Sequence, residues 1–216
     1  TIQKGELLAT KEFTLLVQPV LHELVSWNFN GESRVATGGT TENQDQEISL
    51  IGANITGYVA GVNSSRAINS NTWNSSEESY WLIALQTTGY GNLELSSKQY
   101  GSNTGPKDFK VQYSLDGVSW NDVDGGEIVV ANNWTTGAVT LSLPTEVENQ
   151  ETVYIRWLNT SNVSVTGGIV GSGGTNRIDD ITVTGVEIKQ VGNGHVGKPE
   201  SAPGKPAVPR KLAQLK

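Results

Sequence analysis

The chain has 216 residues, with 25 glycines, no cysteine, no methionine and a formal net charge of -7 at pH 7. The missing cysteines exclude disulfides, thiolate metal sites and a cysteine nucleophile. Because the chain is acidic and has no basic stripe, and no apolar run approaches about 18 residues, we expect neither a nucleic-acid partner nor a membrane-spanning helix.

Residues 1–22 read as one or two strands separated from their sheet. The stretch TIQKGELLATKEFTLLV (1–17) resembles the closing hairpin of a bacterial Ig-like domain, in which a TI-x-KG … A-x-K-x-F-T-x-x-V pattern recurs. The resemblance implies that the chain is part of a longer surface protein, whose export is directed by residues outside this sequence. An ordinary hairpin of the main domain is the alternative.

Residues 24–187 read as one all-β unit, since short strand-like runs recur with Gly, Asn, Asp and Ser between them. No segment of ten residues has a convincing helical period. The sequence therefore predicts a β-sandwich with a jelly-roll or galactose-binding-like layout. The strand-like runs are LVSWNFNG (24–31), SYWLIALQTTGY (79–90), NLELSSKQ (92–99), VYIRWLN (153–159) and RIDDITVTG (177–185).

The stretch KDFKVQYSLDGVSWNDV (107–123) predicts a hairpin, because it alternates, turns at Asp116-Gly117 and alternates again. Shared parity predicts that the inward residues here and on 153–159 are buried. The hairpin is similar to the v-x-y-S-x-D-G-x-x-W hairpin of discoidin-type sandwiches, which implies that it is scaffold and that ligands bind at loops elsewhere. The residues expected to be buried are Phe109, Val111, Tyr113, Trp120, Val153, Ile155 and Trp157.

A wider resemblance covers residues 24–187 and is carried by LVSWNFNG, ATGG, the run from YWLIALQ to YSLDG, YIRW and GGTNRIDDITVTG. These strings look like an accessory domain of large exported bacterial proteins. Such proteins often carry Ig-like repeats, surface-layer anchors and phosphoesterase or nuclease domains. The resemblance implies a secreted or cell-surface location.

The string IDDI (178–181) is the candidate metal site, because Asp179 shares strand parity with Ile181 and Val183 and is therefore expected to point inward. A buried carboxylate needs a partner, and the alternatives are Ca²⁺ and backbone N–H groups. The placement resembles the last-strand Asp that holds a structural calcium in several carbohydrate-binding jelly rolls. The resemblance implies further ligands at Asp180, Asn30 and Glu32, although the acidic cluster usual at the first strand is missing.

Aromatic residues in Gly-, Asn- and Ser-rich loops are the candidate sugar-binding residues, because the C–H face of a pyranose ring is apolar and stacks on exposed rings. Lys98 is expected to add hydrogen bonds. Trp27, Trp120 and Trp157 lie on alternating strands and are expected in the core, and a loop tryptophan can also serve to anchor its loop. The candidate ligand-binding residues are Trp73, Tyr80, Tyr90, Lys98, Tyr100 and Trp134.

The sequence contains no recognisable set of catalytic residues within the predicted domain. The two histidines, His22 and His195, lie outside the predicted domain, and no nucleophile elbow or zinc-protease motif occurs. Residues 188–216 are rich in Pro, Gly and Lys and read as a linker or tail.

The sequence thus predicts a non-catalytic module that binds a glycan or a cell-wall polymer, within a secreted bacterial multi-domain protein. Two alternatives stay open. The unit is a structural spacer or interaction domain without a small ligand, or it is an accessory fragment of an extracellular phosphoesterase or nuclease.

Overall fold

The structure, a computed structural model, describes residues 19–74 and 78–188. This part of the chain forms two antiparallel sheets with two short 3-10 helices, which confirms the expected all-β sandwich. The strands are β1 (Leu21–Trp27), β2 (Gly38–Gly39), β3 (Ser49–Ile51), β4 (Asn54–Ala60), β5 (Arg66–Asn71), β6 (Tyr80–Leu85), β7 (Tyr90–Gly101), β8 (Asp108–Ser114), β9 (Asn121–Val129), β10 (Gly137–Ser142), β11 (Val153–Asn159) and β12 (Asn176–Glu187), and the helices are η1 (Val62–Ser64) and η2 (Thr145–Val147).

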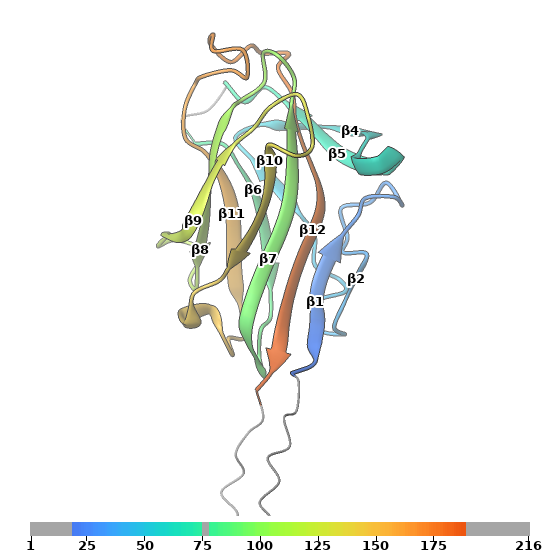
Figure 1. Cartoon of the computed structure of the whole chain (residues 1–216), viewed down its shortest axis with the longest axis vertical. Coiled ribbons are helices and arrows are strands. Elements are labelled where there is room, and N and C mark those ends of the chain that lie inside the picture. The colour runs from blue at the N-terminus through green and yellow to red at the C-terminus, as the bar shows by residue number, and fades with distance from the viewer. Residues whose placement is uncertain (1–18, 75–77, 189–216) are drawn as a thin grey trace, which may run out of the picture.

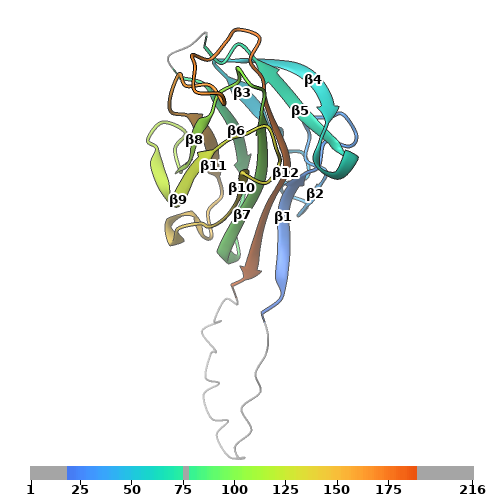
Figure 2. The ribbon, with the colours of Figure 1, turned by 45° about the horizontal axis from the view of Figure 1, so that its top comes forward.

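The seven-stranded sheet faces the viewer in Figure 1, in the order β10-β7-β12-β1-β2, with the hairpin β4–β5 joined to it through β12. The strand β12 runs through the middle of this sheet. Its first residues pair with β5, and its residues from Ile181 onward pair with β1. Because β12 has two successive partners on one edge, the hairpin β4–β5 extends to one side of the sandwich (Figure 2).

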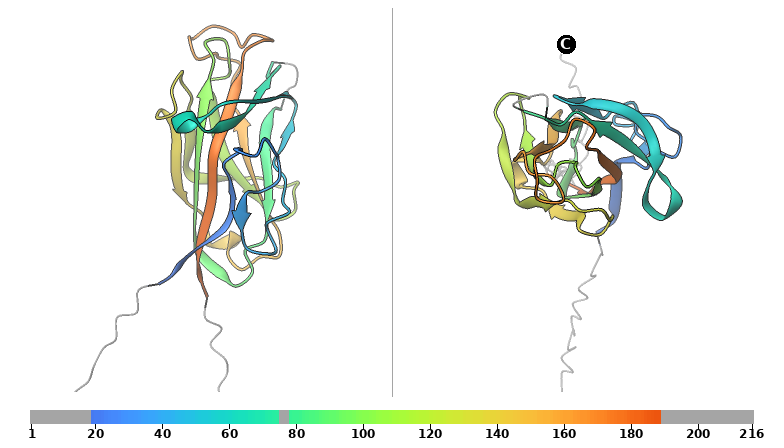
Figure 3. Two further views of the ribbon diagram at one scale, coloured as in Figure 1. Left: turned by 90° about the vertical axis from the view of Figure 1, so that its right-hand side faces the viewer. Right: turned by 90° about the horizontal axis from the view of Figure 1, so that it is seen from above.

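The five-stranded sheet has the order β3-β6-β11-β8-β9 and packs behind the first sheet, as the side and top views in Figure 3 show. The residues at the centre of the interface are large and fully buried, and include Trp27, Trp81 and Trp157. Period-2 alternation along each strand places these side chains between the sheets.

Two core indoles join the sheets by hydrogen bonds. Trp81 Nε1 on β6 donates to Asn176 Oδ1 on β12 at 2.8 Å, and Trp157 Nε1 on β11 donates to Ser97 Oγ on β7 at 3.0 Å. A buried indole N–H costs free energy unless it is paired. The buried polar residues Ser97 and Asn176 are therefore the partners that allow tryptophans to fill this core.

The predicted hairpin is present as β8 and β9, with Gly117 at φ +73° in its connection. Asp116 closes the turn: its Oδ1 accepts hydrogen bonds from the N–H groups of Ser119 at 2.7 Å and Val118 at 2.8 Å. These bonds hold the pKa of Asp116 well below its usual range, since they favour the charged carboxylate.

Most of the residues expected to be buried are in the core: Phe109 and Val111 on β8, with Val153, Ile155 and Trp157 on β11, while Tyr113 is partly buried and packs against it. The expectation was wrong for Trp120. This residue is half-buried and precedes β9, beyond the turn, and its ring lies over Arg156 on the outer face of the sheet. Strand parity does not carry across such a connection.

Trp73 is a second correction, since it was a candidate for sugar stacking. Only 2% of its surface is exposed. Its ring packs edge-on against Trp81 at 5.9 Å and Phe109 at 5.3 Å between centroids, and its Nε1 donates to Ser70 Oγ. A ring in this position is unavailable to a ligand, so Trp73 belongs to the core.

The strands begin at Leu21 and end at Glu187. The predicted Ig-like stretch 1–17 and the predicted tail lie outside the described residues, apart from Ile188. In residues 19–74 and 78–188, no helix has the length and apolar character needed to cross a membrane.

We expect Trp73→Ala to lower the free energy of unfolding by about 3–5 kcal/mol, because it removes a fully buried indole and leaves a cavity. Trp134→Ala is the matched control. Its ring is partly exposed in the β9–β10 connection, and we expect a loss below about 1.5 kcal/mol. Urea denaturation measures both, and equal losses would contradict the placement of Trp73 in the core.

Candidate functional site

The outer face of the five-stranded sheet carries an aromatic and charged cluster, which we call the platform and define as Tyr80, Trp120, Arg156, Gln112 and Asp122. Arg156 points outward from β11, since its neighbours Ile155 and Trp157 are fully buried in the core. Its guanidinium carbon lies 4.2 Å from the centroid of the Trp120 ring and 4.8 Å from that of Tyr80. The two rings cover a cation of which only 5% is exposed.

Hydrogen bonds across three strands fix the orientation of this guanidinium. Arg156 Nε donates to Gln112 Oε1 at 2.8 Å, and Gln112 Nε2 donates to Asp122 Oδ1 at 2.5 Å. Arg156 Nη2 lies 3.4 Å from Glu78 Oε1. These contacts use two of the five N–H donors of the guanidinium.

Asp122 ends this network and also pairs with Lys110, whose Nζ lies 2.8 Å from its Oδ1. The hydrogen bond from Lys110, assisted by that from Gln112, holds the pKa of Asp122 below its ordinary value. The carboxylate therefore stays charged in mildly acidic solution, and the platform keeps its hydrogen bonds there.

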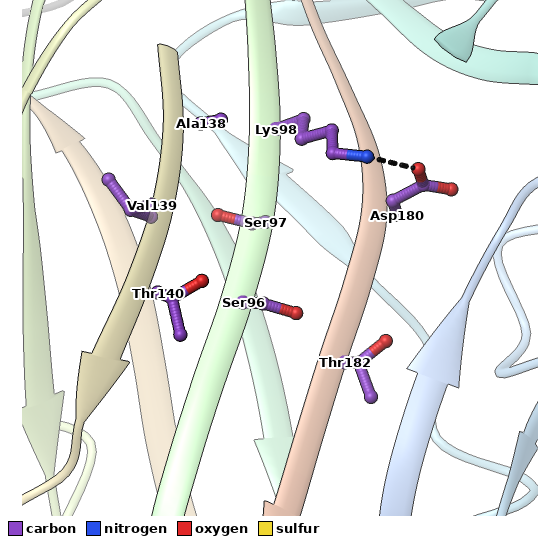
Figure 4. A pocket seen from close by; sticks show the side chains of 8 residues that line it. All are labelled: Ser96, Ser97, Lys98, Ala138, Val139, Thr140, Asp180 and Thr182. Carbon is purple, nitrogen blue, oxygen red and sulfur yellow. Dashed lines mark hydrogen bonds and ion pairs between the residues drawn. The ribbon is translucent and has the colours of Figure 1, made fainter. Parts of the chain in front are cut away.

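A groove of about 250 Å³ lies on the outer face of the other sheet, across β10, β7 and β12 (Figure 4). The hydroxyls of Ser96, Thr140 and Thr182 line it. Lys98 Nζ and Asp180 Oδ2 meet at 2.9 Å along its side, and each of these side chains is 37% exposed. Lys98 is directed outward because Ser97 and Gln99, on either side of it, are buried.

An aromatic pair lies further along the same face. The rings of Tyr100 and Trp134 are 5.4 Å apart between centroids, and the guanidinium carbon of Arg177 lies 4.7 Å from the Tyr100 ring. Lys98 and Tyr100 are two residues apart on one side of β7, which corresponds to about 7 Å. The structure thus brings together three of the predicted ligand-binding residues: Lys98, Tyr100 and Trp134.

The other predicted ligand-binding residues lie apart from these three. Tyr80 belongs to the platform on the opposite sheet, and Trp73 is in the core. Tyr90 is at the other end of β7, about 27 Å from Lys98, where its ring contacts His22 at 5.7 Å. Sequence reasoning missed Trp120 and Arg156, although the alternation around Arg156 indicates that it faces outward.

Asp179 is inward and fully buried, as its parity predicts. Its Oδ2 accepts hydrogen bonds from Val62 N and Ser65 Oγ, both at 2.9 Å, and its Oδ1 accepts from Asp180 N at 2.8 Å. Burial raises the pKa of Asp179 above its ordinary value, and the bonds from Val62 and Ser65 oppose that shift. The sequence predicted donors near the first strand. The observed donors, Val62 and Ser65, lie in the connection between β4 and β5 instead.

The residues expected to bind calcium already have partners. Asn30 Oδ1 accepts a hydrogen bond from Arg66 N at 3.0 Å, and Glu32 Oε1 pairs with Arg66 Nη2 at 2.6 Å. Asp180 points to the opposite face of β12, toward Lys98. In the described residues, no three acidic or histidine side chains gather as a metal-binding group. Calcium takes 6–8 oxygen ligands, backbone carbonyls among them, so calcium binding at this position stays a prediction.

Comparison with known proteins gives structural neighbours only. No family model and no curated protein sequence matches the chain. The solved structures with a similar layout include carbohydrate-binding modules. The CBM22-1 xylan-binding domain of Xyn10C from Paenibacillus barcinonensis has 13% sequence identity and a TM-score of 0.48, over 80% of this chain and 99% of that one.

Two further structural neighbours are also carbohydrate-binding modules. TmCBM61, solved in complex with β-1,4-galactotriose, is 12% identical with a TM-score of 0.44, over 72% of this chain and 92% of that one. The CBM35 from Paenibacillus barcinonensis is 16% identical with a TM-score of 0.40, over 73% of this chain and 96% of that one.

We expect Asp179→Ala to cost about 1–3 kcal/mol of unfolding free energy, because it leaves the buried Val62 N–H and the Ser65 hydroxyl without their acceptor. Asp180→Asn is the control. It keeps a residue that tolerates the φ of +47° found there and removes only a half-exposed ion pair, worth about 0–1 kcal/mol.

Chelation tests the calcium prediction separately. Because protein donors occupy the proposed ligands, we expect EDTA to leave the melting temperature unchanged. An ion that binds only the folded state would stabilise it by mass action, so a lower melting temperature in EDTA that calcium restores would establish a calcium site.

The platform also predicts a pH dependence. Since the folded-state pKa of Asp122 is depressed, its contribution to stability is present above the ordinary Asp value, about 3.9, and is lost as the pH falls through the folded value. We expect Asp122→Asn to lower the urea midpoint at pH 7, and the difference from the native chain to shrink below about pH 4. A difference that stays constant with pH would refute this.

Proposed function

We propose that this chain is a non-catalytic carbohydrate-binding module that binds a polysaccharide on the platform. The observation that carries the proposal is the pair of rings, Trp120 and Tyr80, placed over a guanidinium on an outward sheet face. We further propose, from the resemblance of residues 1–17 and 24–187 to parts of exported bacterial proteins, that it acts at the cell surface or outside the cell.

The chemistry of the platform suits a sugar. An aromatic ring offers an apolar surface to the C–H face of a pyranose, and fixed polar groups beside it bind the hydroxyls. Arg156 is held in place by Gln112 and lies under both rings, so it fixes the positions of the rings before a ligand arrives rather than contacting the ligand itself. Glu78, whose side chain is 59% exposed, adds an acceptor at the margin.

A structural role for the same cluster is the competing explanation. The two rings shield Arg156 from water, and the network from Lys110 to Arg156 stabilises the pairing of β9, β8 and β11 whether or not a ligand binds. A spacer domain needs nothing more. Binding experiments with matched variants separate the two, since only a binding platform loses affinity without unfolding.

The test is isothermal titration with soluble polysaccharides of glucose, xylose, galactose and mannose. We expect at least one to bind, and Trp120→Ala to weaken that binding about tenfold, which corresponds to about 1.4 kcal/mol, the upper range of an aromatic contact. Trp120→Tyr should retain most of the affinity, because it keeps a stacking ring.

Val118→Ala is the control in the same loop. Val118 is 81% exposed and precedes Trp120 by two residues, so its loss tests the loop without the ring. Circular dichroism verifies that each variant is folded. If no polysaccharide binds the native chain, or if Trp120→Ala weakens binding no more than Val118→Ala does, the platform is not a binding site and the proposal fails.

A further inference from the structure

We infer that the groove on the seven-stranded sheet is a second binding site, on the face opposite the platform, for a neutral saccharide. The groove is about 250 Å³ and lies between β10, β7 and β12. Pockets that enclose a drug-sized ligand measure about 300–1,000 Å³, so this one suits a single sugar unit with its neighbours outside.

The lining defines the ligand class. Three hydroxyls, of Ser96, Thr140 and Thr182, share the lining with one paired cation and anion, Lys98 and Asp180, which lie at one end of the group (Figure 4). The pair has no net charge, which favours a neutral ligand over a charged one. The ammonium keeps two N–H donors beyond its bond to Asp180, and the carboxylate keeps further lone pairs. Two adjacent sugar hydroxyls placed alongside the pair can therefore bind it, one donating to the carboxylate and the other accepting from the ammonium.

The anion of this pair is held in an uncommon backbone conformation. Asp180 has φ of +47°, in the left-handed region that few residues other than glycine adopt. Its N–H donates to Asp179 Oδ1, so the buried carboxylate stabilises the bulge and directs the next side chain outward. Backbone strain of this kind gathers at binding sites, where it fixes a side chain before the ligand arrives.

The aromatic pair supplies a second contact. Tyr100 lies about 7 Å from Lys98 along β7, roughly the spacing of residues on one side of a strand, and Trp134 packs against Tyr100 from the β9–β10 connection. A saccharide unit adjoining the one in the groove reaches these rings and stacks on them. An ordinary outward sheet face is polar as well, but the recess and the aromatic pair at one end of it are not required by the fold.

Nuclear magnetic resonance on the full chain labelled with ¹⁵N tests this inference. The probes are β-linked tetrasaccharides of glucose, xylose and galactose. We expect one of them to shift the indole N–H resonance of Trp134 and the amides of residues 96–100 and 180–182. Asp180→Asn should raise the apparent Kd obtained from these shifts at least about tenfold. Lys98→Met should raise it by a similar factor.

The two faces are separated by variants on each. Trp120→Ala removes the platform ring and should leave the groove shifts intact, whereas Asp180→Asn should leave the Trp120 indole shift intact. These variants therefore test binding at the groove and binding at the platform separately. The inference is overturned if no tetrasaccharide shifts the groove resonances, if Asp180→Asn leaves their titration unchanged, or if an oligogalacturonate shifts them more strongly than every neutral probe.

Discussion

The buried carboxylate of Asp179 is the group around which the seven-stranded sheet is arranged. Its two oxygens accept from Val62, Ser65 and Asp180, and so connect the last strand to the β4–β5 connection more than 110 residues earlier in the chain. A carboxylate at 0% exposure is tolerable only with such partners. These bonds sit where β12 passes from β5 to β1, so the same side chain stabilises the irregularity that allows one strand to serve two neighbours.

The two outer faces of the sandwich differ in how their polar side chains are paired. On the five-stranded sheet, the hydrogen bonds run across the strands, from Asp122 through Gln112 to Arg156, and rings cover the buried end. On the seven-stranded sheet, the pair Lys98–Asp180 borders a recess lined by small hydroxyl side chains. The covered cation fixes two rings whose planes are inclined at 54° to each other, whereas the small side chains leave a recess of about 250 Å³.

The features that the sequence revealed are those set by alternation within one strand. The parity of Phe109 and Val111 and the inward direction of Asp179 follow from a period of two, and Asp116-Gly117 marks its own turn. The contacts between residues on different strands could not be predicted from alternation. The donors to Asp179 lie on a hairpin distant in sequence, and Trp120 meets Arg156 only because β8, β9 and β11 have a particular register. Trp73 was misjudged because its Gly-, Asn- and Ser-rich surroundings indicate a loop but not whether that loop turns inward.

The pairing of β1 with β12 brings the two ends of the described chain to one end of the sandwich, where Leu21 lies opposite Val186 (Figure 1). This geometry sets a mechanical property. Tension applied between these two residues loads the ladder in peeling rather than in shear, so its hydrogen bonds break one after another instead of together. The separation would run along β1 from Leu21 toward Trp27, and would then meet the Asp179 network, which connects the remainder of β12 to the β4–β5 hairpin. Under tension, β1 and β12 would therefore separate first at the end that carries the chain termini, before the two outer faces unfold.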